Sequence, residues 1–310
     1  MQVVYGVNRS FLFPALLSAY SAVKNASKPL DVTIFGQDFT DEDIAIVEQV
    51  NQSLTGGTIS YQKFDLENLP GFSEYKSKFP AITMLPLFLP QLCEKRCVFV
   101  DADTLVVSDV WELLDMDLEG QPFAACVDMG LVTLGGGDFL RPSLQQIFRP
   151  GREHKKSLSR VSKSIRLGFI PGEGYFNAGI MVMDCSAIHG DRELREISDF
   201  EKLVPHIPYL PEQDRMNQLF HGRWFRLPIQ WNTRPQIWFD AHSPKYRKMS
   251  KTFRQHLSDA NRTPKIWHYV GGKKPWRATR MARLLFHRAY RDYETYMARF
   301  EKETGLTFTM

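Results

Sequence analysis

The sequence Cys97-Val98-Phe99-Val100-Asp101-Ala102-Asp103 joins an apolar run to a pair of carboxylates. The run predicts a buried strand, and Asp101 and Asp103 follow where that strand meets its loop. Because side chains in an extended segment alternate, both carboxylates are expected to point in the same direction. Two such groups can ligate one divalent cation, and the carboxyl edge of a sheet is where α/β folds bind nucleotides. The D-x-D pair alone is common in surface turns, so the rest of the chain decides its meaning.

Strand and helix patterns alternate through the first half of the chain. Strands are predicted at residues 3–7, 30–35, 58–64 and 97–100, and helices at 11–24, 41–54 and 85–93. Ser10 is a plausible cap for the first helix, and Thr40 precedes the second, which has acids in its first turn. Pro86 and Pro90 limit the third helix. This alternation predicts an α/β fold with a mixed, mostly parallel sheet flanked by helices.

The second half is less regular, and its last segments carry two open alternatives. Strands are predicted at 123–128, 176–183, 223–227 and 266–270. Residues 130–170 are basic, and they form either an insertion at the mouth of the site or a solvated face. The helix pattern at 277–300 places aromatic and apolar residues on one face and arginines on the other. That helix either docks on the core or lies on an anionic membrane surface.

Composition bounds the class of protein. The 310 residues are 43% hydrophobic and 24% charged, with a net charge of +4, as in a globular protein with a sizeable core. No nucleic-acid-binding motif accompanies the basic residues, so no nucleic-acid partner is expected. The four cysteines contain no C-x-x-C pair and are expected to be buried free thiols. With no signal segment and no long apolar run, the sequence favours the cytoplasm.

A second polar segment, at residues 267–276, reads W-H-Y-V-G-G-K-K-P-W. His268 follows apolar Ile266 at strand spacing, so it is expected at the same sheet edge as the D-x-D pair. A neutral imidazole beside two carboxylates suits Mn²⁺ better than Mg²⁺. The glycines allow a close approach to phosphates, and Lys274 supplies a positive charge for them. Alone, His268 would more often be a structural histidine.

Three further polar segments follow, and the first of them suits a sugar. Asn177-Ala178-Gly179 begins an apolar strand, and an Asn amide both donates to and accepts from hydroxyl groups. Glu212-Gln213-Asp214 opens a helix after Pro211, where acids also favour the helix N-terminus for structural reasons. Trp231-Asn232 stands in the loop after the strand at 223–227.

The order D-A-D-T-L-V, F-N-A-G, E-Q-D-x-x-N, W-N and H-Y-V-G-G-K-K-P-W resembles the retaining glycosyltransferases of family eight, which include glycogenin and lipopolysaccharide galactosyl- and glucosyltransferases. The resemblance covers roughly residues 3–276. It implies a GT-A domain at 1–276, followed by a C-terminal amphipathic helical tail at 277–310. It also implies a UDP-sugar donor and Mn²⁺, with Mg²⁺ as the alternative ion.

The resemblance also implies roles, position by position. Asp101, Asp103 and His268 would ligate the metal. The positions that would bind the donor are Asn8 at the base, Asn177 and Ala178 at the sugar, Gly271 and Lys274 at the diphosphate, Asp128 on the sugar or acceptor side, and Ala102. Glu212, Gln213 and Asp214 would flank the sugar and the reacting carbon. Because an amide is a poor nucleophile, a Gln at position 213 favours direct attack by the acceptor hydroxyl, on the same face of the sugar from which the leaving group departs.

Two positions depart from the family pattern. A basic residue usually stands roughly sixteen residues before the D-x-D, but the region around Leu85 has none, and Lys76 or Lys78 is the nearest substitute. Glu212 stands where the family usually has Asp, which moves one carboxylate by a methylene group.

The sequence thus predicts a hexosyltransferase that moves galactose or glucose from a UDP-sugar to a glycan or glycolipid acceptor with retention of configuration. Lipopolysaccharide or surface polysaccharide synthesis is the expected setting, in the cytoplasm or peripherally on the inner face of the membrane through residues 277–300. Two alternatives stay open. One is a metal-dependent nucleotide-sugar hydrolase, and the other is a non-catalytic glycosyltransferase-like binding module.

Overall fold

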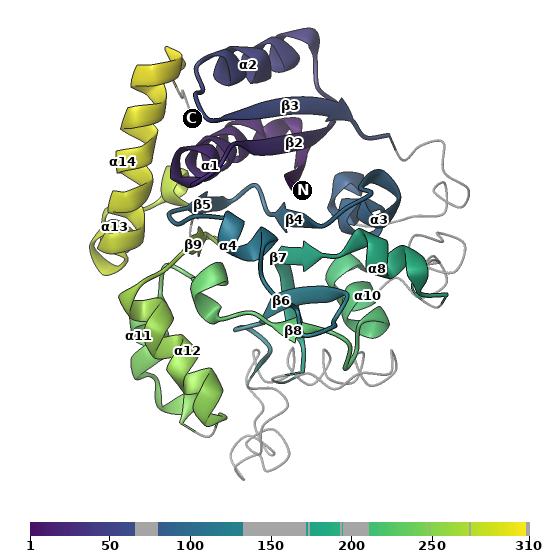
Figure 1. Ribbon diagram of the computed structural model, residues 1–310. Helices are drawn as coiled ribbons and strands as arrows, with labels where there is room; N and C mark the ends of the chain where they lie inside the picture. The colour runs from purple at the N-terminus through teal and green to yellow at the C-terminus, as the bar shows by residue number, and fades with distance from the viewer. Residues whose placement is uncertain are drawn as a thin grey trace.

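A seven-stranded sheet forms the centre of the computed structural model, which describes residues 1–65, 80–132, 172, 174–192, 194, 211–247, 249–272 and 274–307 (Figure 1). The strand order is β3-β2-β1-β4-β7-β6-β8. The strands are β1 (Gln2–Asn8), β2 (Leu30–Gln37), β3 (Gly57–Lys63), β4 (Cys97–Val100), β6 (Phe123–Val127), β7 (Phe176–Met183) and β8 (Phe225–Arg226). Nearly all of the predicted insertion at 130–170, together with Lys76 and Lys78, lies outside the described residues.

The sheet is mixed and mostly parallel, as the sequence predicted. Strands β3, β2, β1 and β4 run parallel to one another, and β8 is parallel to β6. Strand β7 is antiparallel to both β4 and β6. All four residues of β4 are buried, which explains their continuous apolar run, because a central strand faces the core on both sides.

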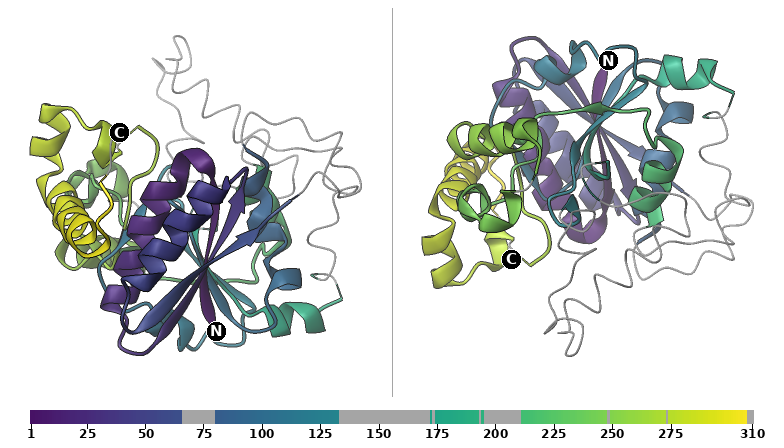
Figure 2. Two further views of the ribbon diagram at one scale, coloured as in Figure 1. Left: turned by 90° about the horizontal axis from the view of Figure 1, so that it is seen from above. Right: turned by 90° about the horizontal axis from the view of Figure 1, so that it is seen from below.

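Helices cover both faces of this sheet (Figures 1 and 2). One face packs against α1 (Leu12–Asn25) and α2 (Asp41–Gln52), with α14 (His287–Thr304) packed on α1, and the other packs against α3 (Leu89–Leu92), α8 (Cys185–Gly190) and α10 (Pro211–Leu219). Strand β1 shows the alternation, since Val3 and Tyr5 face the first layer and Val4 faces the second. The four cysteines are buried and free, which confirms the sequence prediction.

Two predictions about helix boundaries were wrong. Ser10 does not cap α1, because it lies in a 3₁₀ turn, η1 (Arg9–Phe11), and its hydroxyl donates to Asn8 Oδ1 at 2.9 Å. The helix predicted at 85–93 is split into η3 (Ala81–Leu87) and the short α3, because Pro86 and Pro90 lack the N–H groups that a continuous helix needs. By contrast, Thr40 is the N-cap of α2, where Thr40 and Asp43 form a capping box.

A second, two-stranded sheet was not expected from the sequence. It pairs β5 (Thr104–Val106) with β9 (Ile266–His268) in antiparallel register, with Thr104 opposite His268. The strand that carries His268 therefore pairs with β5 and not with a strand of the main sheet, although His268 lies beside the D-x-D pair as predicted. It reaches the D-x-D through β5, which follows directly after the turn at residues 101–103. An isolated bridge between Thr233 and Trp267 ties β9 to the end of η6 (Ile229–Asn232).

The C-terminal segment consists of α13 (Arg280–Leu285) and α14. The aromatic face of α14 is buried: the Phe300 ring lies 5.2 Å from the Tyr20 ring of α1, and the Tyr293 ring lies 5.5 Å from that of Tyr269. An ion pair of 2.6 Å joins Lys24 to Glu303. Of the two interpretations of this segment, docking on the core is therefore the one that describes α14.

The other short elements are α4 (Trp111–Leu114), α11 (Ile237–His242), η7 (Pro244–Tyr246), α12 (Lys251–Arg262) and η8 (Pro275–Arg277). Within the ranges that the structure describes, no helix combines the length and the apolar character that crossing a membrane requires.

Candidate functional site

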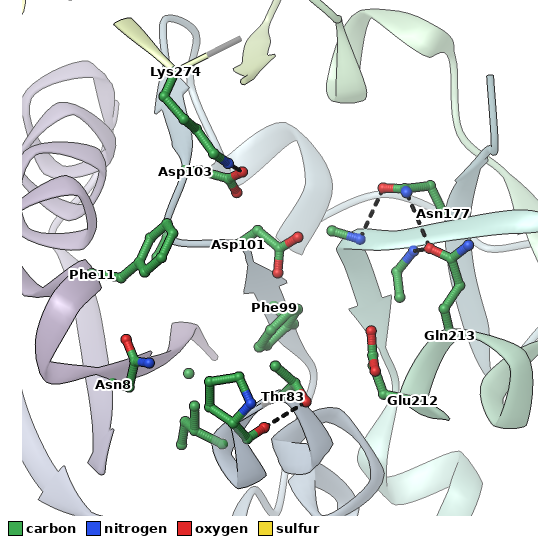
Figure 3. Close-up of a pocket in the computed structure, with 16 residues that line it drawn as sticks. Asn8, Phe11, Thr83, Phe99, Asp101, Asp103, Asn177, Glu212, Gln213 and Lys274 are labelled. Carbon is green, nitrogen blue, oxygen red and sulfur yellow. Dashed lines mark hydrogen bonds and ion pairs between the residues drawn. The ribbon is translucent and has the colours of Figure 1, made fainter. Parts of the chain in front are cut away.

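A pocket of about 330 Å³ lies at the carboxyl ends of β1 and β4 (Figure 3). Its lining is Gly6, Asn8, Phe11, Pro80, Ile82, Thr83, Phe99, Asp101, Ala102, Asp103, Asn177, Ala178, Gly179, Glu212, Gln213 and Lys274. Figure 3 shows Asn8 and Phe11 on one side and Asn177 and Gln213 on the other. Segments far apart in the sequence thus meet at one sheet edge, as parallel α/β topology dictates.

Asp101, Asp103 and His268 form a cluster with the donor atoms of a cation site. His268 Nε2 lies 3.4 Å from Asp101 Oδ2 and 3.3 Å from Asp103 Oδ1. One ligand atom from each residue lies within 4.8 Å of the other two. Although residues 102 and 103 form a turn rather than a strand, both carboxylates face the imidazole. Two oxygens and one nitrogen fit a divalent ion such as Mn²⁺.

The charges of this cluster are strongly coupled. Burial alone would lower the pKa of His268, but Asp103 and Asp101 outweigh it and raise that pKa to about 9. Burial would raise the pKa of Asp103, but His268 and Lys274 hold it well below its usual range. Lys274 forms an ion pair with Asp103, and its Nζ lies 5.6 Å from the Phe11 ring centroid and 5.9 Å from that of Trp276.

The opposite side of the pocket is a network of amides and carboxylates. Gln213 Oε1 accepts from the Ala178 backbone N–H at 3.0 Å and from Asn177 Nδ2 at 3.1 Å. Gln213 Nε2 donates to Asp128 Oδ2 and to the Tyr175 hydroxyl, both at 3.1 Å. Asp128 Oδ2 also accepts from Asn177 Nδ2 at 3.2 Å. Both ends of the Gln213 amide are therefore held in place.

The other two residues of the E-Q-D segment differ in environment. Glu212 lines the pocket, and burial raises its pKa to about 8, with the charges of Asp101 and Asp214 adding to the shift. Asp214 is buried behind Gln213, where its Oδ1 accepts a 2.5 Å hydrogen bond from the Tyr175 hydroxyl.

Two predicted residues take other places. Gly271 is exposed in a turn with a φ of 67°, a conformation that favours glycine, and it is not among the residues that line the pocket. Asp128 lines a neighbouring cavity of about 90 Å³ together with Asn177, Asn232 and Arg234. Every other predicted residue lines the pocket or, like His268 and Asp214, lies buried directly behind its lining.

Sequence reasoning missed several contributors. Gly179 leaves room for the metal cluster, since a Cβ atom there would lie 2.3 Å from His268 Cε1 and 2.8 Å from Asp101 Oδ2.

Phe11 and Thr83 also line the pocket, and Lys274 is the one basic residue in its described lining. Leu85 is fully buried, so the place of the absent basic residue belongs to the core. Asn232 stood in the W-N segment, which carried no assigned role.

The chain matches a known protein family along most of its length. The model of the family described as Glycosyl transferase family 8 matches residues 2–280. General stress protein A of Bacillus subtilis (strain 168) is 24% identical over 184 residues, which are 59% of this chain and 53% of that protein. Lipopolysaccharide 1,2-glucosyltransferase of Escherichia coli (strain K12) is 25% identical over 281 residues, which are 89% of this chain and 72% of that protein. The chain thus spans about half the length of the first relative.

Solved structures share the fold. The WbbM bifunctional glycosyltransferase has a TM-score of 0.69 at 21% identity, over 97% of this chain and 49% of that chain. The galactosyltransferase LgtC, solved with donor and acceptor sugar analogs, has a TM-score of 0.67 at 20% identity, over 100% of this chain and 98% of that chain. These likenesses concern the fold, and they confirm the GT-A architecture that the sequence predicted.

Proposed function

The chain belongs to glycosyl transferase family 8, and from this membership we propose that it transfers a hexose from a UDP-sugar to a hydroxyl group of a glycan acceptor. The observation that carries the proposal is the joint lining of one pocket by a cation cluster and an amide network. The first suits a diphosphate, and the second suits sugar hydroxyls. Galactose and glucose are the favoured sugars, because similar proteins are named for these transfers.

Each part of the pocket has a role in this proposal. Asp101, Asp103 and His268 hold Mn²⁺, which would supply positive charge to stabilise the departing UDP. Lys274 adds a second positive charge beside Asp103. Asn8, at the other end of the pocket, contacts the base (Figure 3).

Gln213 stabilises positive charge on the reacting sugar and does not attack it. Its Oε1 already accepts two hydrogen bonds, and an amide is a weak nucleophile. We therefore favour attack by the acceptor hydroxyl from the face that UDP leaves, with a phosphate oxygen of UDP taking the proton. A glycosyl adduct trapped on Gln213 or Asp214 would overturn this mechanism.

The test is a panel of UDP-sugars scored for UDP release with Mn²⁺, with and without glycan acceptors. We expect release that depends on both the ion and an acceptor. Asp101→Ala and Asp103→Ala should each abolish turnover, whereas Asp115→Ala, at an exposed surface ion pair, should not. Equal release without acceptor would indicate the hydrolase, and binding of UDP with Mn²⁺ in calorimetry without turnover would indicate a binding module.

We also propose the extent of the catalytic unit, the process that it serves and its place in the cell. Residues 1–276 form the catalytic unit, and the segment 277–310 is a helical tail fixed on it. Surface polysaccharide synthesis, with lipopolysaccharide as the leading case, is supported by the printed activity of the Escherichia coli relative. Four free thiols favour the cytoplasm, and we place the protein peripherally on the inner face of the membrane.

A peripheral contact with anionic lipid can use only residues that α14 leaves exposed. Met281 and Leu284 of α13 are 62% and 71% exposed, and Trp238 of α11 is 56% exposed. The two helices meet where the Phe239 and Phe286 rings lie 6.0 Å apart. Exposed Arg277, Arg280 and Arg283 surround α13, so the apolar side chains are accompanied by positive charge.

Vesicle sedimentation tests this contact in the intact chain. The double variant Met281→Asp, Leu284→Asp should lose binding to vesicles that contain anionic lipid, while Leu92→Asp, an exposed leucine on α3, should keep it. Equal binding by all three proteins would contradict a membrane role for α13.

A further inference from the structure

The imidazole of His268 is held from both of its nitrogen atoms. Nε2 faces Asp101 and Asp103, and Nδ1 lies 2.8 Å from Asn232 Oδ1. His268 is 3% exposed and Asn232 is 6% exposed, so water cannot easily replace either contact. Asn232 is not among the residues that line the main pocket. Its contacts point instead to an action through His268.

The orientation of the Asn177 side-chain amide is set by two neighbours, because one of them can only donate a hydrogen bond and the other accepts one. Asn177 Oδ1 lies 3.0 Å from the Gly179 backbone N–H, which can only donate. At the other end, Asn177 Nδ2 lies 3.2 Å from an Asp128 carboxylate oxygen, which accepts. A flipped Asn177 would face oxygen with oxygen and N–H with N–H, so its orientation is determined.

This orientation passes to Asn232 and then to His268. Because Asn177 Oδ1 is an acceptor, the Asn232 atom 2.8 Å away must be the donor Nδ2. The remaining Asn232 atom, Oδ1, accepts from His268 Nδ1, which must therefore carry a hydrogen. Because Nδ1 donates to Asn232, Nε2 is the nitrogen that can ligate an ion held between the two carboxylates, and the ligating ring is the Nδ1–H tautomer.

The backbone holds Asn232 against β9. The Thr233 N–H donates to the Ile266 carbonyl at 2.9 Å, and the His268 N–H donates to the Thr233 carbonyl at 2.8 Å. These bonds tie the residue after Asn232 to both ends of the strand that carries the imidazole. Asn232 therefore keeps its place relative to the ring.

We propose that Asn232 is a positioning residue for the cation site: it selects the His268 tautomer that presents Nε2 to the ion and fixes the plane of the ring. The inference rests on the cation site of the proposed function and adds a residue to it. Partners of ligating histidines typically change metal affinity about 10–100-fold when they are removed.

The experiment uses Mn²⁺ alone as the probe, with the full chain and no sugar nucleotide. Free Mn²⁺ is measured by electron paramagnetic resonance, and coordinated nitrogen is detected by pulsed methods in protein with ¹⁵N-labelled histidine. Asn232→Leu should weaken Mn²⁺ binding at least tenfold and remove the nitrogen coupling. Asn232→Asp keeps an oxygen for Nδ1–H but loses the donor to Asn177 Oδ1, so it should keep the nitrogen coupling and bind Mn²⁺ more tightly than Asn232→Leu.

The matched control is Asn51→Leu, which removes a side-chain acceptor for the Ile59 N–H far from the site. It should leave Mn²⁺ affinity and nitrogen coupling unchanged. The proposal is overturned if Asn232→Leu keeps both properties, or if the Leu and Asp variants lose them equally.

A second test uses the wild type, so that the proposal can be checked even if the Asn232 variants do not fold. With Mg²⁺ as a diamagnetic ion, proton–nitrogen correlation spectra of ¹⁵N-histidine protein should place the His268 proton on Nδ1, with the signal assigned by its loss in His268→Gln. A proton on Nε2 would overturn the proposal. If the wild type binds neither ion, the cation site itself fails, and the tautomer is then read in metal-free protein at a pH where the ring is neutral.

Discussion

At the scale of single residues, the carboxyl groups of the pocket do not share one charge state. His268 and Lys274 keep Asp103 ionised, whereas burial raises the pKa of Glu212 to about 8. At neutral pH and without ligands, Glu212 is therefore mostly protonated and can donate a hydrogen bond. In the proposed reaction, a neutral carboxyl at this position would donate to a sugar hydroxyl, as an ionised one could not.

The raised pKa of Glu212 predicts a pH-dependent stability. Its pKa in the unfolded chain is near 4.5, so between pH 4.5 and 8 the folded protein retains a proton that the unfolded chain releases. This costs stability as the pH rises, and Glu212→Gln avoids the cost. The variant should gain about 1–3 kcal/mol over the wild type at pH 8, with no gain at pH 4. Thermal unfolding across this range measures the difference, and Glu48→Gln, on the exposed side of α2, should show none.

Gly179 predicts a steric effect on the cation cluster. In Gly179→Ala the new methyl group would lie 2.3 Å from His268 Cε1, so the ring must move. We expect a loss of about 1–3 kcal/mol in unfolding free energy and at least a tenfold weaker binding of Mn²⁺. Titration of Mn²⁺ and urea unfolding measure the two effects. Gly174→Ala has no atom near its new methyl group and should change neither.

At the scale of elements, the short strands β5 and β9 decide whether a cation site exists at all. The turn at residues 101–103 leads directly into β5, and the pairing of Thr104 with His268 brings the imidazole to the carboxylates. Helix α14 supports this pair from behind. The Trp267 indole N–H donates to Asp292 at 2.9 Å, and the Tyr269 hydroxyl donates to the Ala289 carbonyl at 2.8 Å.

Docking of α14 predicts that its aromatic side chains stabilise the whole fold. Phe300 is fully buried against Tyr20, so Phe300→Ala should cost about 3–5 kcal/mol in unfolding free energy. Lys302→Ala, at an exposed position of the same helix, should cost little. Chemical denaturation of both variants measures this. A similar, small cost for both would mean that α14 is a dispensable tail.

At the scale of the whole molecule, the cation site couples ion binding to folding. The three ligands come from residues 101, 103 and 268, and only the folded chain brings them within 4.8 Å. An ion that binds the folded state alone stabilises it by mass action.

This coupling predicts a stability gain of about 2.7 kcal/mol when Mn²⁺ is present at 100 times its dissociation constant. The melting temperature should rise by several degrees. Asp103→Asn removes one ligand, and its melting temperature should not respond to Mn²⁺, although its starting stability can differ. Calorimetric scans with and without the ion measure this. An equal rise in the variant would place Mn²⁺ at another site.

Much of the fold could be predicted from local sequence patterns. The strands at 97–100 and 176–183 were correct to the residue, because central strands need uninterrupted apolar runs. Local patterns failed where competing interactions decide, as at Ser10, which bonds Asn8 instead of capping α1. The prolines shortened the helix at 85–93 further than expected, since each removes a backbone donor.

The sequence by itself determined the chemical groups of the site and their order along the chain, and from these the family and the GT-A fold. Only the tertiary structure decided the second sheet, the charge state of Glu212, the exposed turn at Gly271 and the tautomer of His268. The physical reason is distance along the chain. The pairing of residues 104 and 268, the burial of Glu212 by distant segments, and the hydrogen bond between residues 232 and 268 produce no periodic pattern in the local sequence.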